Sequence, residues 1–428
     1  MTPQSNFMVV APILPGREAA LRALLATMNR QEGIVDPANG LVPFGRFDWL
    51  HVARFVILKD ETLGDLPPDD PMRDAPVWLA FLADCDGDAD SALAEIVAQA
   101  GAGLSQIFDH CADFSASADL LPWLRERSVG PAAQYVNWVG RTVQQIREEA
   151  ALRAALQGYL AREAAALAGL APEIVRDRLI SFRRDHGPAL TPPAPTPADW
   201  RCRHLLNLIG VPLALLLLSP FMLLYAPIFV WQLRRRETSD PVIAPPPTPA
   251  HVEALSRIED FDVSNQFSAF GSVKPGHFRL WTLLFVFWVL DFSTRQIYTR
   301  GRLARVGTIH FARWVFLDGR RRLFFASNYD GSLDSYMDDF INKVAYGLNL
   351  VFSNGIGYPR TSFLLNGGAK DELTFKHYLR RHELPTQVWY KAYPGLTAAD
   401  LARNTMIREG LEKPRMSGDE ARQWLALI

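Results

Sequence analysis

The most apolar part of the chain lies near its middle and carries no charged side chain. It runs from Leu205 to Leu233, and the run Leu213 to Leu218 is its most hydrophobic portion. A helix that is apolar on every face is typical of a segment buried in lipid, because a soluble protein would have to surround it with a large protein shell. The pattern therefore predicts attachment to a lipid bilayer through residues 201–236.

Two features predict that this segment forms a hairpin that enters and leaves the bilayer on one side. Three prolines interrupt it, and Pro220 near the midpoint favours a kink. Positive charge, which is retained in the cytoplasm, stands at both ends, as Arg201, Arg203, Arg234, Arg235 and Arg236. A single span is the alternative, because a straight, tilted helix of this length also crosses a core of about 30 Å.

Several blocks of the N-terminal part recur in the same order in the C-terminal part. The second block has the pattern His-x-Ala-Arg. These residue types are unlikely to recur in two strands merely because strands have a similar composition. The order of the blocks predicts an internal duplication. The matched pairs are Asn6–Gly16 with Gln266–Gly276, His51–Val56 with His310–Val315, Asp86-Gly87 with Asp330-Gly331, and Gly103-Leu104 with Gly347-Leu348.

The periodicity of apolar residues predicts the same elements in both copies: a strand, a helix, two adjacent strands and a second amphipathic helix. The paired strands are expected at 51–58 and 77–83, and at 310–317 and 322–327. A last strand is expected at Phe363 to Leu365. This is the element order of the split βαβ, ferredoxin-like unit. The arrangement resembles the dimeric α/β-barrel superfamily, with two subunits fused into one chain.

The resemblance implies an α+β fold in which two ferredoxin-like repeats pair as an intrachain α/β barrel. Pairing of the two sheets requires both repeats to lie on the same side of the bilayer. The expected parts are ferredoxin-like repeat 1 at 1–120, a helical insert at 121–187, a Pro-rich linker at 188–200, the membrane hairpin or span at 201–236, a second Pro-rich linker at 237–255, ferredoxin-like repeat 2 at 256–395, and a C-terminal helical tail at 396–428.

Two helical regions differ between the copies or stand outside them. Residues 278–298 are apolar on all sides, aromatic and flanked by arginine, as in a helix that lies in the membrane interface. Burial between the barrel and the stretch Tyr135 to Leu170 is the alternative. That Ala, Glu and Arg-rich stretch is expected to pack on the barrel exterior.

Composition narrows the class of protein. The 45 Lys and Arg residues are balanced by 46 Asp and Glu, which argues against a nucleic-acid binder that works through a positive field. Three widely separated cysteines do not form a disulfide framework. The first residues lack the features of a secretory signal. We therefore expect a protein of the cytoplasmic membrane with both repeats on the cytoplasmic side.

No Cys-x-x-Cys pair, zinc-protease motif, dinucleotide loop or nucleophile elbow occurs in the sequence. The superfamily that the chain resembles includes haem enzymes, such as dye-decolourising peroxidases, and cofactor-free enzymes that act on apolar substrates. Asn328-Tyr329-Asp330-Gly331 keeps the Asp-Gly pair of the peroxidase motif but not its first Gly. The resemblance implies His310, Arg313, Asn328 and Asp330 as catalytic candidates.

A haem would need a histidine as axial ligand, and His310, His377 and His382 are the candidates in the second copy. Alternatively, His310 and Arg313 bind carboxylates such as Asp330 or Asp334 and stabilise the sheet. Asp86 and Asp330 have a similar alternative as turn and cap residues. Candidates for substrate or anion binding are Tyr329, Tyr358, Arg360 and Trp389.

Two functions remain open. One is an oxidoreductase, peroxidase-like or cofactor-free, that takes an apolar or lipid-like substrate from the bilayer. The other is a non-catalytic, membrane-tethered module that binds a lipid or a protein partner. The sequence leaves the oligomeric state open, including a homo-oligomer.

Overall fold

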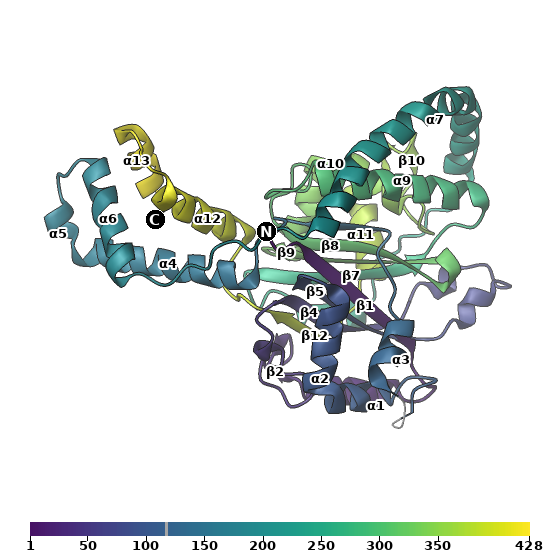
Figure 1. The fold of residues 1–428 in the computed structure, drawn as a ribbon. Coiled ribbons are helices and arrows are strands. Elements are labelled where there is room, and N and C mark those ends of the chain that lie inside the picture. The colour runs from purple at the N-terminus through teal and green to yellow at the C-terminus, as the bar shows by residue number, and fades with distance from the viewer. Residues whose placement is uncertain (116–118) are drawn as a thin grey trace.

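The computed structural model describes residues 1–115 and 119–428, and it confirms a mixed α+β fold. Two four-stranded antiparallel sheets form its centre (Figure 1). The first has the strand order β1-β5-β4-β12, and the second has the order β6-β8-β9-β7. The strands of the first sheet are β1 (Gln4–Pro12), β5 (Trp78–Asp86), β4 (Leu50–Leu58) and β12 (Thr386–Lys391). Those of the second are β6 (Ala133–Val136), β8 (Ile309–Leu317), β9 (Arg322–Asp330) and β7 (Ser264–Ser272).

Each sheet has one face covered by two main helices and the other face packed on its counterpart. Alternating residues produce this division, since Phe55 and Ile57 pack under helices while Val56 and Leu58 pack against the second sheet. The helices of the first sheet are α1 (Glu18–Ala26) and α2 (Ala89–Phe108), followed by α3 (Leu120–Glu126). Those of the second are α9 (His277–Gln296) and α10 (Leu333–Phe352), followed by α11 (Glu372–His382). Short strand pairs lie outside the sheets, as β2 (Asn29–Gln31) with β3 (Ile34–Val35) and β10 (Thr361–Ser362) with β11 (Asn366–Gly367).

The edge strands cross between the two sheets. β6 comes from the N-terminal part but pairs with β8, and β12 comes from the C-terminal part but pairs with β4. Just before β6, Ser128 forms a β-bridge with Val9 of β1, and just before β12, Glu383 forms a β-bridge with Ala269 of β7. The two halves of the chain are thereby joined by backbone hydrogen bonds on both sides.

The predicted last strand at Phe363 to Leu365 is wrong. Phe363 and Leu364 have φ angles of 55° and 59°, which extended strands do not allow, and they form the turn between β10 and β11. Glu237 fixes this turn, because its carboxylate accepts the backbone N–H groups of both residues. The last strand of the second half is β12 instead.

A helical arm projects from the sheets (Figure 1). It combines α4 (Val143–Arg162), α5 (Ala164–Leu167) and α6 (Pro172–His186) with α12 (Ala398–Glu412) and α13 (Gly418–Leu425). Leu152, Leu156 and Leu179 pack there against Ile407 and Trp424. The stretch expected on the outside of a barrel therefore begins in a strand, at Tyr135, and its helix packs against the C-terminal tail.

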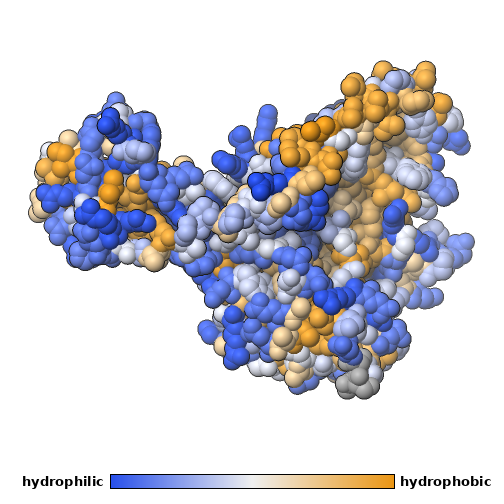
Figure 2. All heavy atoms as spheres, viewed as in Figure 1, coloured by the Kyte–Doolittle hydropathy of each residue, from blue (hydrophilic) through white to orange (hydrophobic). Residues whose placement is uncertain are grey.

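The apolar segment forms one long helix, α7 (Ala198–Ser239), and a short helix, α8 (Pro249–Ser256), follows it. α7 is the only helix in the described part of the chain that is long and apolar enough to cross a membrane, and its most apolar window is not buried in the protein. It accounts for much of the hydrophobic surface in Figure 2.

Both ends of α7 return to α9. Near its start, Asn207 accepts a hydrogen bond from Gln296 at 3.0 Å, and near its end, the Arg236 guanidinium lies 4.9 Å from the ring centroid of Phe278. A straight helix from Asn207 to Arg236 would be about 44 Å long, whereas Phe278 to Gln296 spans only about 27 Å. α7 therefore bows away from α9, and Figure 1 shows it bending back at its top. Pro212, Pro220 and Pro227 lie in the bowed part.

Candidate functional site

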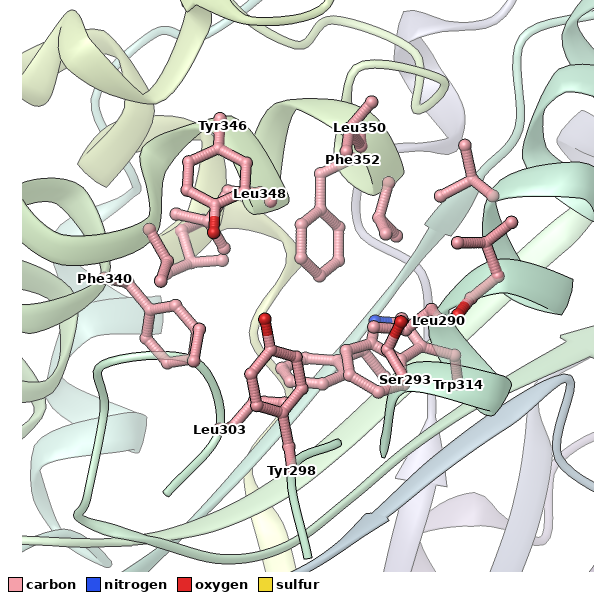
Figure 3. Close-up of a pocket in the computed structure, with 18 of the residues that line it drawn as sticks. Leu290, Ser293, Tyr298, Leu303, Trp314, Phe340, Tyr346, Leu348, Leu350 and Phe352 are labelled. Atoms are coloured by element: carbon pink, nitrogen blue, oxygen red, sulfur yellow. Dashed lines mark hydrogen bonds between the residues drawn. The ribbon is translucent and has the colours of Figure 1, made fainter. Parts of the chain in front are cut away.

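A cavity of about 330 Å³ lies between the second sheet and the two helices that cover it. The sheet contributes Phe267, Trp314 and Phe325, and the walls come from α9, α10 and the loop after α9 (Figure 3). The volume falls within the range of small-molecule pockets, about 300–1,000 Å³. All of its lining side chains are uncharged. This cavity is the best formed candidate for a ligand site in the described residues.

The corresponding space over the first sheet is filled. Val42, Phe44 and Phe47, from the loop before β4, are fully buried there. Gly103 of α2 lies so close to the backbone of Leu41 that a Cβ atom at this glycine would clash with it. The matching glycine of α10, Gly347, has no atom within 4 Å of such a position and lines the cavity. At this pair of matching positions, α2 packs directly against the loop before β4, whereas α10 leaves open space.

Five side chains of the lining carry an uncharged polar group, namely Ser293, Tyr298, Trp314, Tyr336 and Tyr346. Trp314 of β8 is 5 % exposed, and its Nε1–H has no hydrogen-bond partner within the described residues. The hydroxyl groups of Tyr298 and Tyr346 are directed into the space between the labelled residues in Figure 3. None of these residues was among the site residues predicted from the sequence. The available signal was Trp314 at the position that Phe55 holds in the matching N-terminal sequence block.

The predicted residues His310 and Asp330 come together at the other end of the second sheet. His310 Nε2 lies 2.7 Å from Asp330 Oδ1, and the Ser264 hydroxyl lies 3.2 Å from the same nitrogen. A β-bulge places His310 in this position, because His310 and Phe311 together stand opposite Asn328. Burial lowers the pKa of His310, and Asp330 opposes that effect. Lys391 donates to Ser264 at 2.6 Å, and burial lowers its pKa to about 8.

The first sheet contains a similar arrangement. His51 Nε2 lies 3.0 Å from Asp86 Oδ1, and its Nδ1 lies 3.2 Å from the Tyr393 hydroxyl. Each aspartate also accepts a backbone N–H at the start of an arm helix, Asp86 from Val143 and Asp330 from Ala398. Asp86 and Asp330 are nevertheless not the N-cap residues of these helices, because Thr142 and Thr397 cap α4 and α12, and Asp88 and Ser332 cap α2 and α10.

The other catalytic candidates lie between the sheets. Arg313 donates to the carbonyl oxygens of Phe7 and Ala83 in the first sheet and pairs with Asp84 at 2.6 Å. Asn328 accepts the backbone N–H of Phe311 at the bulge. The Arg313 contacts join the two sheets, whereas the Asn328 contact links β8 and β9 within the second sheet, and neither side chain lines the cavity.

The candidates for substrate or anion binding do not converge on one site. Tyr329 is buried and stacks on Tyr336 with ring centroids 4.0 Å apart. Tyr358 is buried and donates to Asn349. Arg360 is exposed, and Trp389 lies under the guanidinium of Arg54 at 4.8 Å. Each belongs to a different part of the fold.

The histidines do not fit a haem. The space beside His310 is about 20 Å³, and the nitrogen that would bind iron already contacts Asp330 and Ser264. His377 is half-buried on α11, His382 is buried against Tyr378, and neither lines the large cavity. In the described residues, no group of three or more His, Cys, Asp or Glu side chains is arranged to hold a metal ion.

No family model, curated protein or solved structure matches this chain. The geometry of the site is therefore the basis of the function proposed below.

Proposed function

We propose that the protein is a membrane-attached module that binds a lipid-like molecule in the cavity over its second sheet. The observation that carries this proposal is a cavity of about 330 Å³ with an uncharged, mainly aromatic and aliphatic lining. Burial of an apolar ligand against such a surface is favourable by roughly 25 cal/mol per Å² of apolar surface removed from water. A polar metabolite would lose its contacts with water without gaining partners.

The position of the cavity suits a ligand that comes from a bilayer. α9 forms one of its walls and also contacts both ends of α7. Phe285, on the lining face of α9, is 41 % exposed, and Trp281 on the same helix is 67 % exposed. In this proposal α7 dips into the membrane as a re-entrant arch, and α9 lies at the membrane surface. Both sheets then stand on one side, which we assign to the cytoplasm from the arginines at both ends of α7.

The fold proposal is a fused pair of ferredoxin-like repeats that close into one barrel. Its support is the shared strand order in both sheets and the exchange of β6 and β12. In such a duplication one copy has kept a filled core, whereas the other has opened a cavity. This difference favours a binding role for the second copy.

Binding is favoured over an oxidoreductase reaction because no carboxylate, imidazole, amine or thiol side chain lines the cavity. General acid–base chemistry uses such a group or a tyrosine within hydrogen-bond reach of the substrate, and the tyrosines of this lining have no charged side chain beside them in it. The His310 and Asp330 pair has that chemistry, but the space beside it is about 20 Å³. An apolar substrate cannot enter that space without a rearrangement of the sheet ends.

The test is saturable binding of N-phenylnaphthylamine, whose emission rises in apolar surroundings, to the full chain in detergent micelles. We expect one site per chain, and a Gly347→Leu substitution should remove it by filling the cavity. Gly158→Leu on α4 is the matched control, since that helical glycine meets only the end of the Arg162 side chain. Equal binding by wild type and Gly347→Leu would contradict the proposal.

A further inference from the structure

The cavity contains one buried donor whose partner is missing from the protein. Trp314 is 5 % exposed, and its indole Nε1–H makes no hydrogen bond with any described residue. A buried donor without a partner loses about the free energy of a hydrogen bond, so such groups are rare in folded proteins. Trp314 also lines the cavity, together with Leu290 and Ser293 of α9 (Figure 3).

The duplication supplies an internal comparison. At the matching position of β4 the chain has Phe55, which is fully buried and stacks on Phe81 at 4.4 Å. A phenyl ring therefore serves the closed core, where nothing needs to be bound. The indole occurs in the copy that has the cavity, and its nitrogen is the main chemical difference between the two rings. Packing alone does not require this nitrogen.

The lining also limits the charge of a ligand. Its polar groups are donors or hydroxyls, namely the Trp314 indole and the hydroxyl groups of Ser293, Tyr298, Tyr336 and Tyr346. None of them can neutralise a carboxylate or a phosphate, and a buried anion without a partner charge is costly. An anionic lipid chain is therefore a poor occupant of this cavity.

From these observations we infer that the ligand is an uncharged lipid with a carbonyl oxygen, which accepts a hydrogen bond from Trp314 Nε1. A carbonyl suits this position because the indole only donates, and a carbonyl brings no donor of its own that would need a partner. The volume of about 330 Å³ is at the small end of ligand pockets, so the occupant has a single chain. This inference rests on the proposed function and specifies its ligand class.

The experiment compares a long-chain methyl ketone with the alkane and the fatty-acid anion of equal length. Each competes with N-phenylnaphthylamine for the full chain in dodecyl maltoside micelles. After each affinity is corrected for partitioning of the ligand into the micelles, we expect the ketone to bind about tenfold more tightly than the alkane. Trp314→Phe should lower ketone affinity about tenfold and leave alkane affinity unchanged. The partitioning of each ligand into micelles cancels when wild type is compared with Trp314→Phe, because both are measured in the same detergent.

A spectroscopic measurement tests the hydrogen bond itself. The carbonyl stretching band of a ¹³C-labelled ketone should move to lower wavenumber when bound to wild type, and this shift should be absent in Trp314→Phe. Trp281→Phe, at the exposed tryptophan of α9, is the matched control and should behave as wild type. Phe55 in the first copy shows that a phenyl ring suits the strand position.

The outcomes separate the two claims. If alkane and ketone bind equally, or if the band shift persists in Trp314→Phe, the assignment of Trp314 is overturned while lipid binding stands. Tightest binding of the fatty-acid anion would overturn the uncharged ligand class. Failure of every probe to bind would contradict both this inference and the proposed function.

Discussion

Arg54 and Arg313 each cross to the opposite sheet and donate to matching carbonyl oxygens there. Arg54 donates to Phe267 and Ser327 at 2.9 and 3.0 Å, and Arg313 donates to Phe7 and Ala83 at 2.8 and 2.9 Å. This explains the arginine of the His-x-Ala-Arg pattern, which joins the sheets. The histidine of the same pattern binds an aspartate within its own sheet, Asp86 for His51 and Asp330 for His310.

The two arginines share one carboxylate, and this leads to the first prediction. Asp84 pairs with Arg313 at 2.6 Å, but the matching position in the second sheet is Asn328. Burial, with Arg313 nearby, lowers the pKa of Arg54 to about 9. Asp84→Asn should therefore cost about 3–5 kcal/mol in the free energy of unfolding, measured by urea denaturation. Adding Asn328→Asp to that variant should recover part of the loss, because it returns one carboxylate to the interface.

Ligand binding by the same variants separates a structural role of positions 84 and 328 from a role in the cavity. If they only stabilise the sheets, ligand binding to the cavity is unchanged wherever the variants are folded. A folded Asp84→Asn variant with wild-type stability would show that the carbonyl contacts alone satisfy both arginines.

The second prediction concerns the loss of stability as the pH rises from weakly acidic to slightly alkaline. Burial raises the pKa of Glu383 to about 8, Arg380 opposes this effect, and Glu259 adds to it. Between about pH 4.5 and 8 the folded chain binds a proton at Glu383 that the unfolded chain releases, so stability falls as pH rises. The slope is at most about 1.4 kcal/mol per pH unit. Glu383→Gln should flatten the dependence of Tm on pH in this range, whereas Glu372→Gln, at an exposed position on α11, should not. An unchanged profile in Glu383→Gln would contradict the raised pKa.

The third prediction concerns acid. Burial lowers the pKa of His310 below its ordinary value of 6.5. Below about pH 6.5 the unfolded chain therefore binds a proton that the folded chain does not, and stability falls as the pH decreases toward the folded-state pKa. His310→Gln should reduce this loss, measured as the change in Tm between pH 7 and 5. A loss of equal size in the variant would assign the acid sensitivity to other groups.

The sequence predicted most of the local elements around both sheets because each of the matching sequence blocks contains its own strand or helix pattern. The exchange of β6 and β12 was not predicted, since both strands are short and their partners lie far away in sequence. The turn at Phe363 and Leu364 has an apolar composition that resembles a strand, and only its contacts with Glu237 reveal its conformation.

The candidate site was less accessible to sequence reasoning. The hydrogen bond between His310 and Asp330 was among the alternatives, and it is present. The cavity was not predicted, because it exists where no side chain fills the space between the sheet and its helices, and a sequence pattern does not show such an empty space. Gly103 and Gly347 align in sequence, but only the packing of Leu41 distinguishes them.

The fourth prediction uses these two glycines. Gly103→Ala should destabilise the chain by about 1–3 kcal/mol, because the added methyl group meets the backbone of Leu41. Gly347→Ala should be tolerated and can gain up to about 1 kcal/mol, since alanine favours a helix and the position is open. The free energies of unfolding of the two variants provide the test. Equal losses would mean that the space beside Gly347 is filled.

The last prediction tests whether α7 enters and leaves the membrane on one side. Cys202 is an exposed cysteine before the apolar segment, whereas Cys85 and Cys111 are buried, so a membrane-impermeant maleimide should label Cys202 in the native chain. Ser239→Cys combined with Cys202→Ser moves the label to the exposed C-terminal end of α7. In sealed vesicles of one orientation, both positions should react to the same extent, and in inverted vesicles both should change together. Labelling from opposite sides would place the sheets on different sides of the bilayer, which the hydrogen bonds of β6 with β8 and of β12 with β4 forbid within one chain. That result would contradict both the arch and the exchange of edge strands.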